Sequence, residues 1–270
     1  MFAIMGGLIK LVSVDTPTEL IVFFRNFFGF LLILPFILKR GLRHLATEIP
    51  RWHLARALFG LAAMYSFFYS INHIPLAESV LLSYTTPLFA PFLAYLILKE
   101  AISVRLIFAV ILGFVGVVFL LNPDFRAFSW ASLVALSSGL FASAAMTSIR
   151  KMSTSEPAIR IVFYYGFICT AVSAVPVLLI EQWPGVNILM TLLAVGAFAT
   201  LGQYCLTKAY SMANVAQVGP FVYSTVVFAS IIAWLFWQEI PSLFTGFGIF
   251  LVIIAGTLAL RQTPVAGNGQ

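Results

Sequence analysis

Charged side chains are scarce in this sequence. They make up 9% of its 270 residues, whereas about 25% of the residues in an ordinary soluble domain are charged. So few charges could not form the water-facing surface of a core built from 61% hydrophobic residues. The mean hydropathy of +1.04 supports the same conclusion. The composition therefore excludes a soluble protein and predicts an integral membrane protein that has the lipid bilayer as its solvent.

Side chains that serve catalysis and metal binding are also few. The sequence holds nine Asp and Glu, three His and two Cys. Cys169 and Cys205 lie in apolar runs without the paired spacing of a disulfide or a metal site. An intramembrane enzyme would need His, Ser or paired carboxylates at membrane depth, and we find no such constellation. We therefore expect no enzyme activity, no cofactor and no metal site. A Gly-x-x-x-x-Gly-Lys-Ser/Thr loop is missing as well, so ATP is not expected to drive the protein directly.

The basic residues lie mostly in short loops between apolar segments. The formal net charge of +6 therefore predicts orientation in a membrane, not a nucleic-acid partner. With the N-terminus in the cytoplasm, only Arg126 falls outside, and Lys10 and Arg25 fall within spans. This bias predicts that both termini are cytoplasmic and that the number of spans is even. The remaining basic residues then lie at or near the cytoplasmic side: Lys39, Arg40, Arg43, Arg51, Arg56, Lys99, Arg105, Arg150, Lys151, Arg160, Lys208 and Arg261.

Apolar runs separated by turn residues predict an all-α protein with ten transmembrane helices. A span needs roughly 20 apolar residues, and the runs follow one another with short connections. The first run, 1–13, is clearly too short. The expected helices are 1–13, 19–38, 53–71, 76–98, 104–121, 127–149, 157–180, 188–211, 215–237 and 241–260.

The two halves of the sequence resemble each other. A shift of 139 residues places Tyr84 on Tyr223, and a shift of 140 aligns the beginnings. Because each copy holds five spans, an odd number, the second copy must enter the membrane upside down. We therefore predict two inverted five-helix repeats, 1–122 and 123–261, followed by a disordered tail at 262–270. Inverted repeats give inward-open and outward-open states of similar energy, which favours transport by alternating access.

The repeat also bears on the short first helix. Its counterpart begins near Ala127, and the shift of 140 would place the matching start before Met1. We therefore expect that roughly a dozen residues of the first helix precede this sequence.

Several motifs carry a family likeness: Arg56-Ala-Leu-Phe-Gly60 at the start of a helix, YSFFYSINHIPLAESVLLSYTTPLFAPFLAYLILKE from Tyr65, and KAYSMANVAQVGPFVYSTVVF followed by WQEIPS in the second half. The chain resembles the drug/metabolite transporter superfamily, and within it the ten-helix EamA-type transporters. The resemblance implies transport of a small organic metabolite, amino-acid-like or a cofactor such as S-adenosylmethionine or riboflavin. It also implies a bacterial inner membrane.

Polar side chains within the spans are the candidate substrate contacts. Such groups are costly in lipid unless they face a cavity or one another. Proline residues in the same spans bend the helices and free carbonyl groups, which is tolerated beside a water-filled cavity. The alternative is that the hydroxyl groups only form hydrogen bonds between helices. The candidates for a central cavity are Tyr65, Tyr69, Tyr84, Thr85, Gln203, Tyr204 and Tyr223.

Arg25 is a further candidate, because it interrupts the second span. It could contact an anionic group of the substrate, pair with Glu19 or extend to the membrane surface. Glu78 could carry a coupling proton, or be a solvated carboxylate at a helix start. We expect His44, His53 and His73 at the surface, and we expect Glu100 and Glu239 to form local structural hydrogen bonds.

These observations predict a secondary transporter of a small molecule, with coupling to a proton or to exchange left open. Two alternatives remain. The first is a passive channel, although channels are typically built from charges or carbonyl groups repeated by symmetry among subunits. The second is an intramembrane enzyme, although this sequence lacks the catalytic residues that such an enzyme would need at membrane depth.

Overall fold

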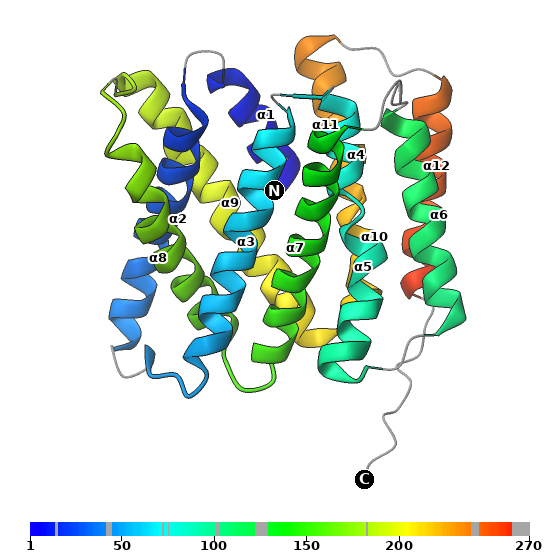
Figure 1. Cartoon of the computed structure of the whole chain (residues 1–270), viewed down its shortest axis with the longest axis horizontal. Helices are drawn as coiled ribbons and strands as arrows, with labels where there is room; N and C mark the ends of the chain where they lie inside the picture. The colour runs from blue at the N-terminus through cyan, green and yellow to red at the C-terminus, as the bar shows by residue number, and fades with distance from the viewer. Residues whose placement is uncertain are drawn as a thin grey trace. The chain divides into compact units, whose positions relative to one another are not determined.

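In the computed structural model, the described chain folds into a series of helices (Figure 1). The structure describes residues 1–13, 16–41, 45–71, 73–74, 76–100, 103–121, 129–181, 183–238 and 243–260. Asn72, Glu239 and His44 lie outside these ranges, as do the loop around Arg126 and the tail. The helices are α1 (Phe2–Val12), α2 (Thr18–Arg40), α3 (Pro50–Ile71), α4 (Leu76–Ser83), α5 (Thr86–Leu93), η2 (Ala94–Leu98), α6 (Val104–Leu121), α7 (Trp130–Met152), α8 (Ala158–Val177), α9 (Val186–Met212), α10 (Val215–Val222), α11 (Ser224–Trp237) and α12 (Leu243–Leu260).

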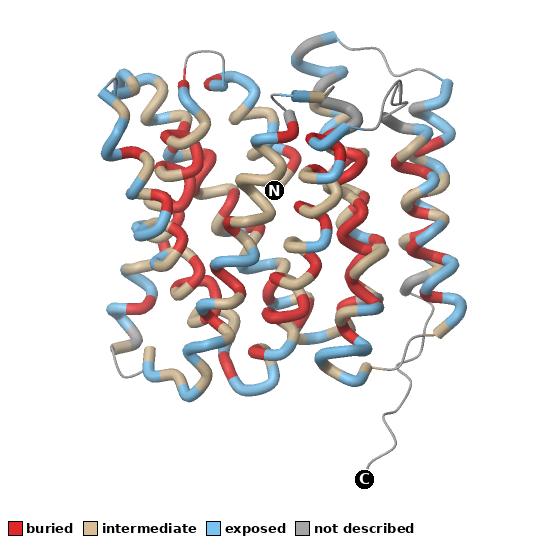
Figure 2. Tube along the Cα trace, in the orientation of Figure 1, coloured by how far each residue is buried: buried red, intermediate tan, exposed pale blue. Residues whose placement is uncertain are grey.

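The prediction of an all-α membrane protein is confirmed. Among the described residues, 6 helical segments are long and apolar enough to cross a bilayer, and α1, α6 and α12 contribute shorter apolar helices. Large apolar side chains remain exposed, such as Phe36 at 62% and Phe92 at 63%. Exposed apolar side chains in such number suit lipid better than water. Figure 2 shows buried and exposed positions alternating along the helices, as expected when one face packs and the other meets acyl chains.

Two of the predicted spans are broken in the middle. The span predicted at 76–98 consists of α4, α5 and η2, and the span predicted at 215–237 consists of α10 and α11. Pro87 follows the first break at the start of α5, where its missing N–H costs nothing. Pro220 lies one turn before the second break and removes one backbone hydrogen bond of α10. The breaks fall at Tyr84-Thr85 and at Tyr223.

The backbone of the two halves repeats with the offset found in the sequence. Helices α4 and α10 begin at Leu76 and Val215, and α6 and α12 begin at Val104 and Leu243, so both pairs differ by 139. The two breaks differ by the same number. Among the described residues, the non-glycine positions with positive φ are Lys99 at 57° and Gln238 at 56°, again 139 apart. An unusual conformation at matching positions is hard to attribute to composition alone.

The described chain forms two compact units. Unit 1 comprises residues 1–58 and 152–211, and unit 2 comprises residues 59–151 and 212–270. Each unit therefore takes helices from both sequence repeats. In unit 1, α2 packs on its counterpart α8, and in unit 2, α6 packs on α12. Figure 1 shows both pairs running antiparallel, which is the arrangement that inverted repeats require.

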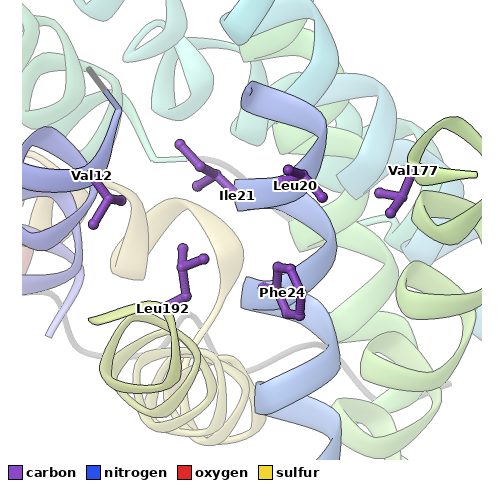
Figure 3. Packing of buried hydrophobic residues seen from close by; sticks show 6 residues of the cluster. All are labelled: Val12, Leu20, Ile21, Phe24, Val177 and Leu192. Atoms are coloured by element: carbon purple, nitrogen blue, oxygen red, sulfur yellow. The ribbon is translucent and has the colours of Figure 1, made fainter. Parts of the chain in front are cut away.

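Each unit has its own apolar core. In unit 1, side chains from α1, α2, α8 and α9 meet in the cluster drawn in Figure 3: Val12, Leu20, Ile21, Phe24, Val177 and Leu192. In unit 2, Leu81, Val117 and Val252 pack around Tyr223 and Val226. The glycine-bearing faces of α6 and α12 meet closely, because a Cβ atom at Gly116 would lie 2.9 Å from the carbonyl oxygen of Gly248. This close approach is typical of helix association in membranes.

The Gly116→Val variant is expected to separate α6 from α12 and to destabilise unit 2. Overpacking of this kind costs about 1–3 kcal/mol, which would lower the apparent Tm in detergent by about 2–10 °C. The matched control is Gly246→Val on α12, where an added Cβ meets no atom within 4 Å. Equal melting temperatures for the two variants would contradict this account of the helix pair.

Candidate functional site

A small recess in unit 1 gathers the polar side chains of three apolar helices. It is lined by Arg25 and Asn26 from α2, by Tyr165 from α8, and by Thr200 and Gln203 from α9. The space inside is that of roughly one or two water molecules. The recess is therefore the size of a single polar group and not of a whole metabolite.

Glycines on α2 and α9 bring these side chains together. A Cβ atom at Gly29 would collide with the hydroxyl group of Thr200, and one at Gly196 would lie 2.9 Å from the backbone nitrogen of Gly29. The two helices therefore touch through their backbones at the recess. The polar residues on either side of this contact are held at a fixed spacing by it.

Arg25 is almost fully buried, with 8% of its surface exposed, and its neighbour Asn26 is 4% exposed. The Nη1 atom of Arg25 donates a hydrogen bond of 2.9 Å to Oδ1 of Asn26. A charge at the centre of a span costs about 2.5–3.5 kcal/mol on insertion scales, so these contacts must offset a substantial penalty. The location agrees with the prediction that Arg25 is a candidate contact, and its role remains a prediction.

Arg56 is a second buried arginine, and the sequence did not predict its position inside the unit. It was expected near the cytoplasmic side as an orientation-setting charge, yet only 5% of its surface is exposed. Its Nη2 atom donates a hydrogen bond of 2.8 Å to Oε1 of Gln203. Its guanidinium carbon lies 4.0 Å from the ring centroid of Tyr165, a cation–π contact. Arg56 therefore fixes two of the side chains that line the recess.

Helix α9 presents Gln203 and Tyr204 in different directions. Gln203 is half-buried at the recess, and Thr207 and Tyr210 on the same face are buried. Tyr204 is 40% exposed and Lys208 is exposed. A step of one residue turns the side chain by about 100° around a helix. The structure therefore brings Gln203, but not Tyr204, together with Arg25.

In unit 2, the predicted residues at the helix breaks lie in packed surroundings. Tyr223 is fully buried, and its hydroxyl group lies 3.5 Å from the carbonyl oxygen of Val110. Tyr84 packs against the same cluster. The hydroxyl group of Thr85 donates a hydrogen bond of 2.6 Å to the carbonyl oxygen of Leu82 and so satisfies one carbonyl at the break. These contacts are structural, and a further role in substrate binding stays a prediction.

The two predicted tyrosines of α3 differ in exposure. Tyr65 is half-buried, whereas Tyr69 is 42% exposed. The ring of Tyr69 stacks on His73 with the centroids 4.1 Å apart. His73 is exposed, as expected. Asn72 and the side chain of Glu78 lie outside the described part of the chain.

The prediction that His53 lies at the surface is wrong. His53 is 2% exposed, its ring lies against that of Tyr164 at 4.4 Å, and its Nε2 atom is 3.7 Å from Oε2 of Glu156. Glu156 also accepts hydrogen bonds from Thr47 at 2.6 Å and from Arg160 at 2.8 Å. Glu156 lies in the connection before α8. Its carboxylate joins this connection to the segment before α3 through Thr47. A histidine at the start of an apolar helix gives no sign of this partner, which is more than 100 residues away in the sequence.

Glu100 has a structural role that reaches further than expected. Its carboxylate accepts a hydrogen bond of 2.8 Å from Nε of Arg150, whose Nη2 donates to Oδ1 of Asn214 at 3.0 Å. Asn214 is the N-cap of α10 and forms a capping box with Gln217. The chain of contacts joins the end of η2, α7 and the start of α10 within unit 2.

Within the described part of the chain, no group of three His, Cys, Asp or Glu is placed to hold a metal ion. The polar recess of unit 1, set in an all-helical apolar protein, is thus built from arginine, amide and aromatic side chains. Such a site can bind and orient a polar group.

Comparison with known sequences identifies the family. The EamA-like transporter family matches this sequence twice, over residues 1–122 and again over 129–261. The chain belongs to the EamA-like transporter family. It is thus a multi-pass membrane protein of a transporter family, as the resemblance predicted.

Several named transporters are similar to this chain over most of its length. The pseudopaline exporter of Pseudomonas aeruginosa is 32% identical over 97% of this chain and 92% of its own length. The S-adenosylmethionine uptake transporter of Rickettsia bellii is 30% identical over 87% of this chain and 81% of its own. The riboflavin transporter of Vibrio cholerae is 24% identical over 94% of this chain and 88% of its own. These names support transport of a small molecule by this chain.

A solved crystal structure of a protein shares the fold. It aligns with a TM-score of 0.81 at 19% identity, and the alignment covers 95% of this chain and 93% of the other. This likeness shows the fold alone.

Glu156→Ala is expected to destabilise unit 1 strongly, because it removes the acceptor of two hydrogen bonds and the carboxylate beside His53. Loss of a buried charged acceptor costs about 2–4 kcal/mol, and the apparent Tm in detergent should fall by roughly 4–15 °C. The control is Glu48→Ala, an exposed carboxylate of the segment before α3, which should change the Tm little. A Glu156→Ala variant as stable as the control would show that this network does not hold the connection.

Proposed function

We propose that the chain is a secondary transporter that moves a small organic metabolite across the bacterial cytoplasmic membrane by alternating access. The observation that supports this is the antiparallel packing of repeat counterparts, α2 on α8 and α6 on α12. Two copies of one fold that face opposite ways can exchange conformations, and the exchanged state opens toward the other side at a similar energy.

The names of the relatives narrow the class of substrate. Pseudopaline, S-adenosylmethionine and riboflavin are named for proteins that match most of this chain. We propose an organic metabolite of this kind as the substrate, with coupling to a proton or to exchange of metabolites. Both termini are proposed to lie in the cytoplasm, with the repeats at 1–122 and 123–261 inserted in opposite directions.

The predicted side chains remain the proposed substrate contacts. Arg25 and Gln203 are supported by their position at a polar recess of unit 1. Aromatic faces would hold apolar or cationic parts of a substrate by about 0.5–2 kcal/mol each. The remaining members of the set are Tyr204 in unit 1, and Tyr65, Tyr69, Tyr84, Thr85 and Tyr223 in unit 2.

Transport by a carrier predicts counterflow in proteoliposomes. Vesicles loaded with an excess of unlabelled pseudopaline, S-adenosylmethionine or riboflavin should transiently accumulate the labelled compound above its external concentration, because a carrier exchanges one molecule for another. Protein-free liposomes are the control. Equilibration without overshoot would indicate a passive channel, and label recovered in a chemically altered product would indicate an enzyme.

The inverted repeats predict opposite exposure of two counterpart positions. Lys99 and Gln238 should lie on the cytoplasmic and the outer side, respectively. In a background with Cys169→Ser and Cys205→Ser, a membrane-impermeant maleimide should label Gln238→Cys in intact cells and Lys99→Cys only after permeabilisation. Labelling of both from the same side would refute the inverted topology.

A further inference from the structure

The recess of unit 1 contains two amide side chains whose orientation is dictated by arginine. A guanidinium group has only donors, so each amide must turn its oxygen toward its arginine. Gln203 does so toward Arg56, and Asn26 does so toward Arg25. The NH₂ groups of both amides are then left to donate elsewhere.

Two of the donors at this place have no acceptor among the described residues. These are Nδ2 of Asn26 and Nε of Arg56, both inaccessible to solvent. Both residues are more than nine-tenths buried. Buried donors are almost always paired. Because Asn26 lines the recess, its Nδ2 atom indicates that an acceptor is missing there, and Arg56 holds the second such donor behind Gln203.

The charge of the recess is positive. Arg25 lines it directly, and Arg56 lies behind Gln203 and Tyr165. Gln203 connects the two, because it accepts the hydrogen bond of Arg56 and lines the recess together with Arg25. No Asp or Glu lies among the described residues that line the recess. The buried carboxylate of Glu156 is already engaged by Thr47 and Arg160.

We infer that this recess binds a carboxylate group of the transported metabolite, held by the NH₂ groups of Asn26 and Gln203 and by the charge of Arg25 and Arg56. A carboxylate is planar, supplies two acceptor oxygens and is small enough for a space of roughly one or two water molecules. A phosphate group, whether free or in a lipid headgroup, is larger and tetrahedral. The inference rests on the proposed function and assigns the substrate to the organic acids.

The first experiment compares acids with their amides. The purified full chain is titrated with three pairs, L-methionine and L-methioninamide, succinate and succinamide, and nicotinate and nicotinamide, with melting temperature as the readout. At a concentration about 100 times its Kd, at least one acid should raise the Tm by several degrees, and its amide should not. Acetate, chloride and phosphate serve as anion controls.

Three variants test the residues. Asn26→Leu and Arg56→Gln should weaken binding of the acid by about 10- to 100-fold, because hydrogen bonds to a charged group are lost. Arg51→Gln, an exposed arginine on the same helix as Arg56, should bind as the unaltered chain does. If one of these variants does not fold, Asn26→Asp is tested in its place. That variant keeps the acceptor for Arg25 and places a carboxylate in the recess, so the ligand-free protein should melt at a higher temperature and should no longer respond to the acid.

The outcomes separate the two proposals. Equal shifts with an acid and its amide, absence of a shift with every acid, an Asn26→Asp variant that melts no higher than the unaltered chain, or equal shifts with chloride or phosphate would each overturn the carboxylate site. Counterflow by the unaltered chain together with one of these results leaves the transporter standing without this site. If counterflow fails while an acid, but not its amide, raises the Tm, the transporter is refuted and an anion-binding site remains.

Discussion

Close packing of α2 on its counterpart α8, and of α6 on its counterpart α12, is the constraint on which the structure depends. In lipid the hydrophobic effect contributes little to the association of helices, because the surrounding acyl chains are also apolar. Association therefore depends on small residues and complementary faces that allow close packing. The contact of Gly116 with the backbone at Gly248 in unit 2 and that of Gly166 on α8 with Phe30 on α2 in unit 1 meet this need. Each of these contacts joins a residue of the first repeat to one of the second.

This pairing explains why the compact units differ from the sequence repeats. A repeat defined by similarity runs along the chain, whereas a unit is defined by which faces bury one another. Because α2 needs α8 and α6 needs α12, each unit collects helices from both halves. The sequence repeats therefore divide the chain by similarity, whereas the compact units divide it by which helices pack together.

Much of the fold could be predicted from the sequence. The offset of 139 residues, seen in side chains such as Tyr84 and Tyr223, recurs in helix bounds and in the left-handed backbone at Lys99 and Gln238. Pro87 and Pro220 near the breaks are visible in the sequence, and proline favours a break because it lacks the N–H group of a continuous helix. Periodicity and turn chemistry are local properties, and a single sequence carries them in full.

The candidate site was only partly predictable. Arg25 drew attention because it interrupts an apolar span, but Arg56 lies near the start of a helix, where basic residues usually serve orientation. The sequence therefore gave no reason to place Arg56 over Tyr165. His53 was misplaced for a similar reason, since its partner Glu156 comes from a distant connection. Pairings between segments more than 100 residues apart depend on tertiary packing, which local patterns do not contain.

The helix pairs have a consequence for any shorter ancestor of this chain. A five-helix polypeptide equal to one repeat would leave the glycine face of its α6 equivalent without a partner. It could fill that face only with a second copy inserted the other way up, as a dual-topology homodimer. Fusion of two such genes would let the copies diverge, and the equivalent positions Lys99 and Gln238 share a backbone conformation while their side chains differ.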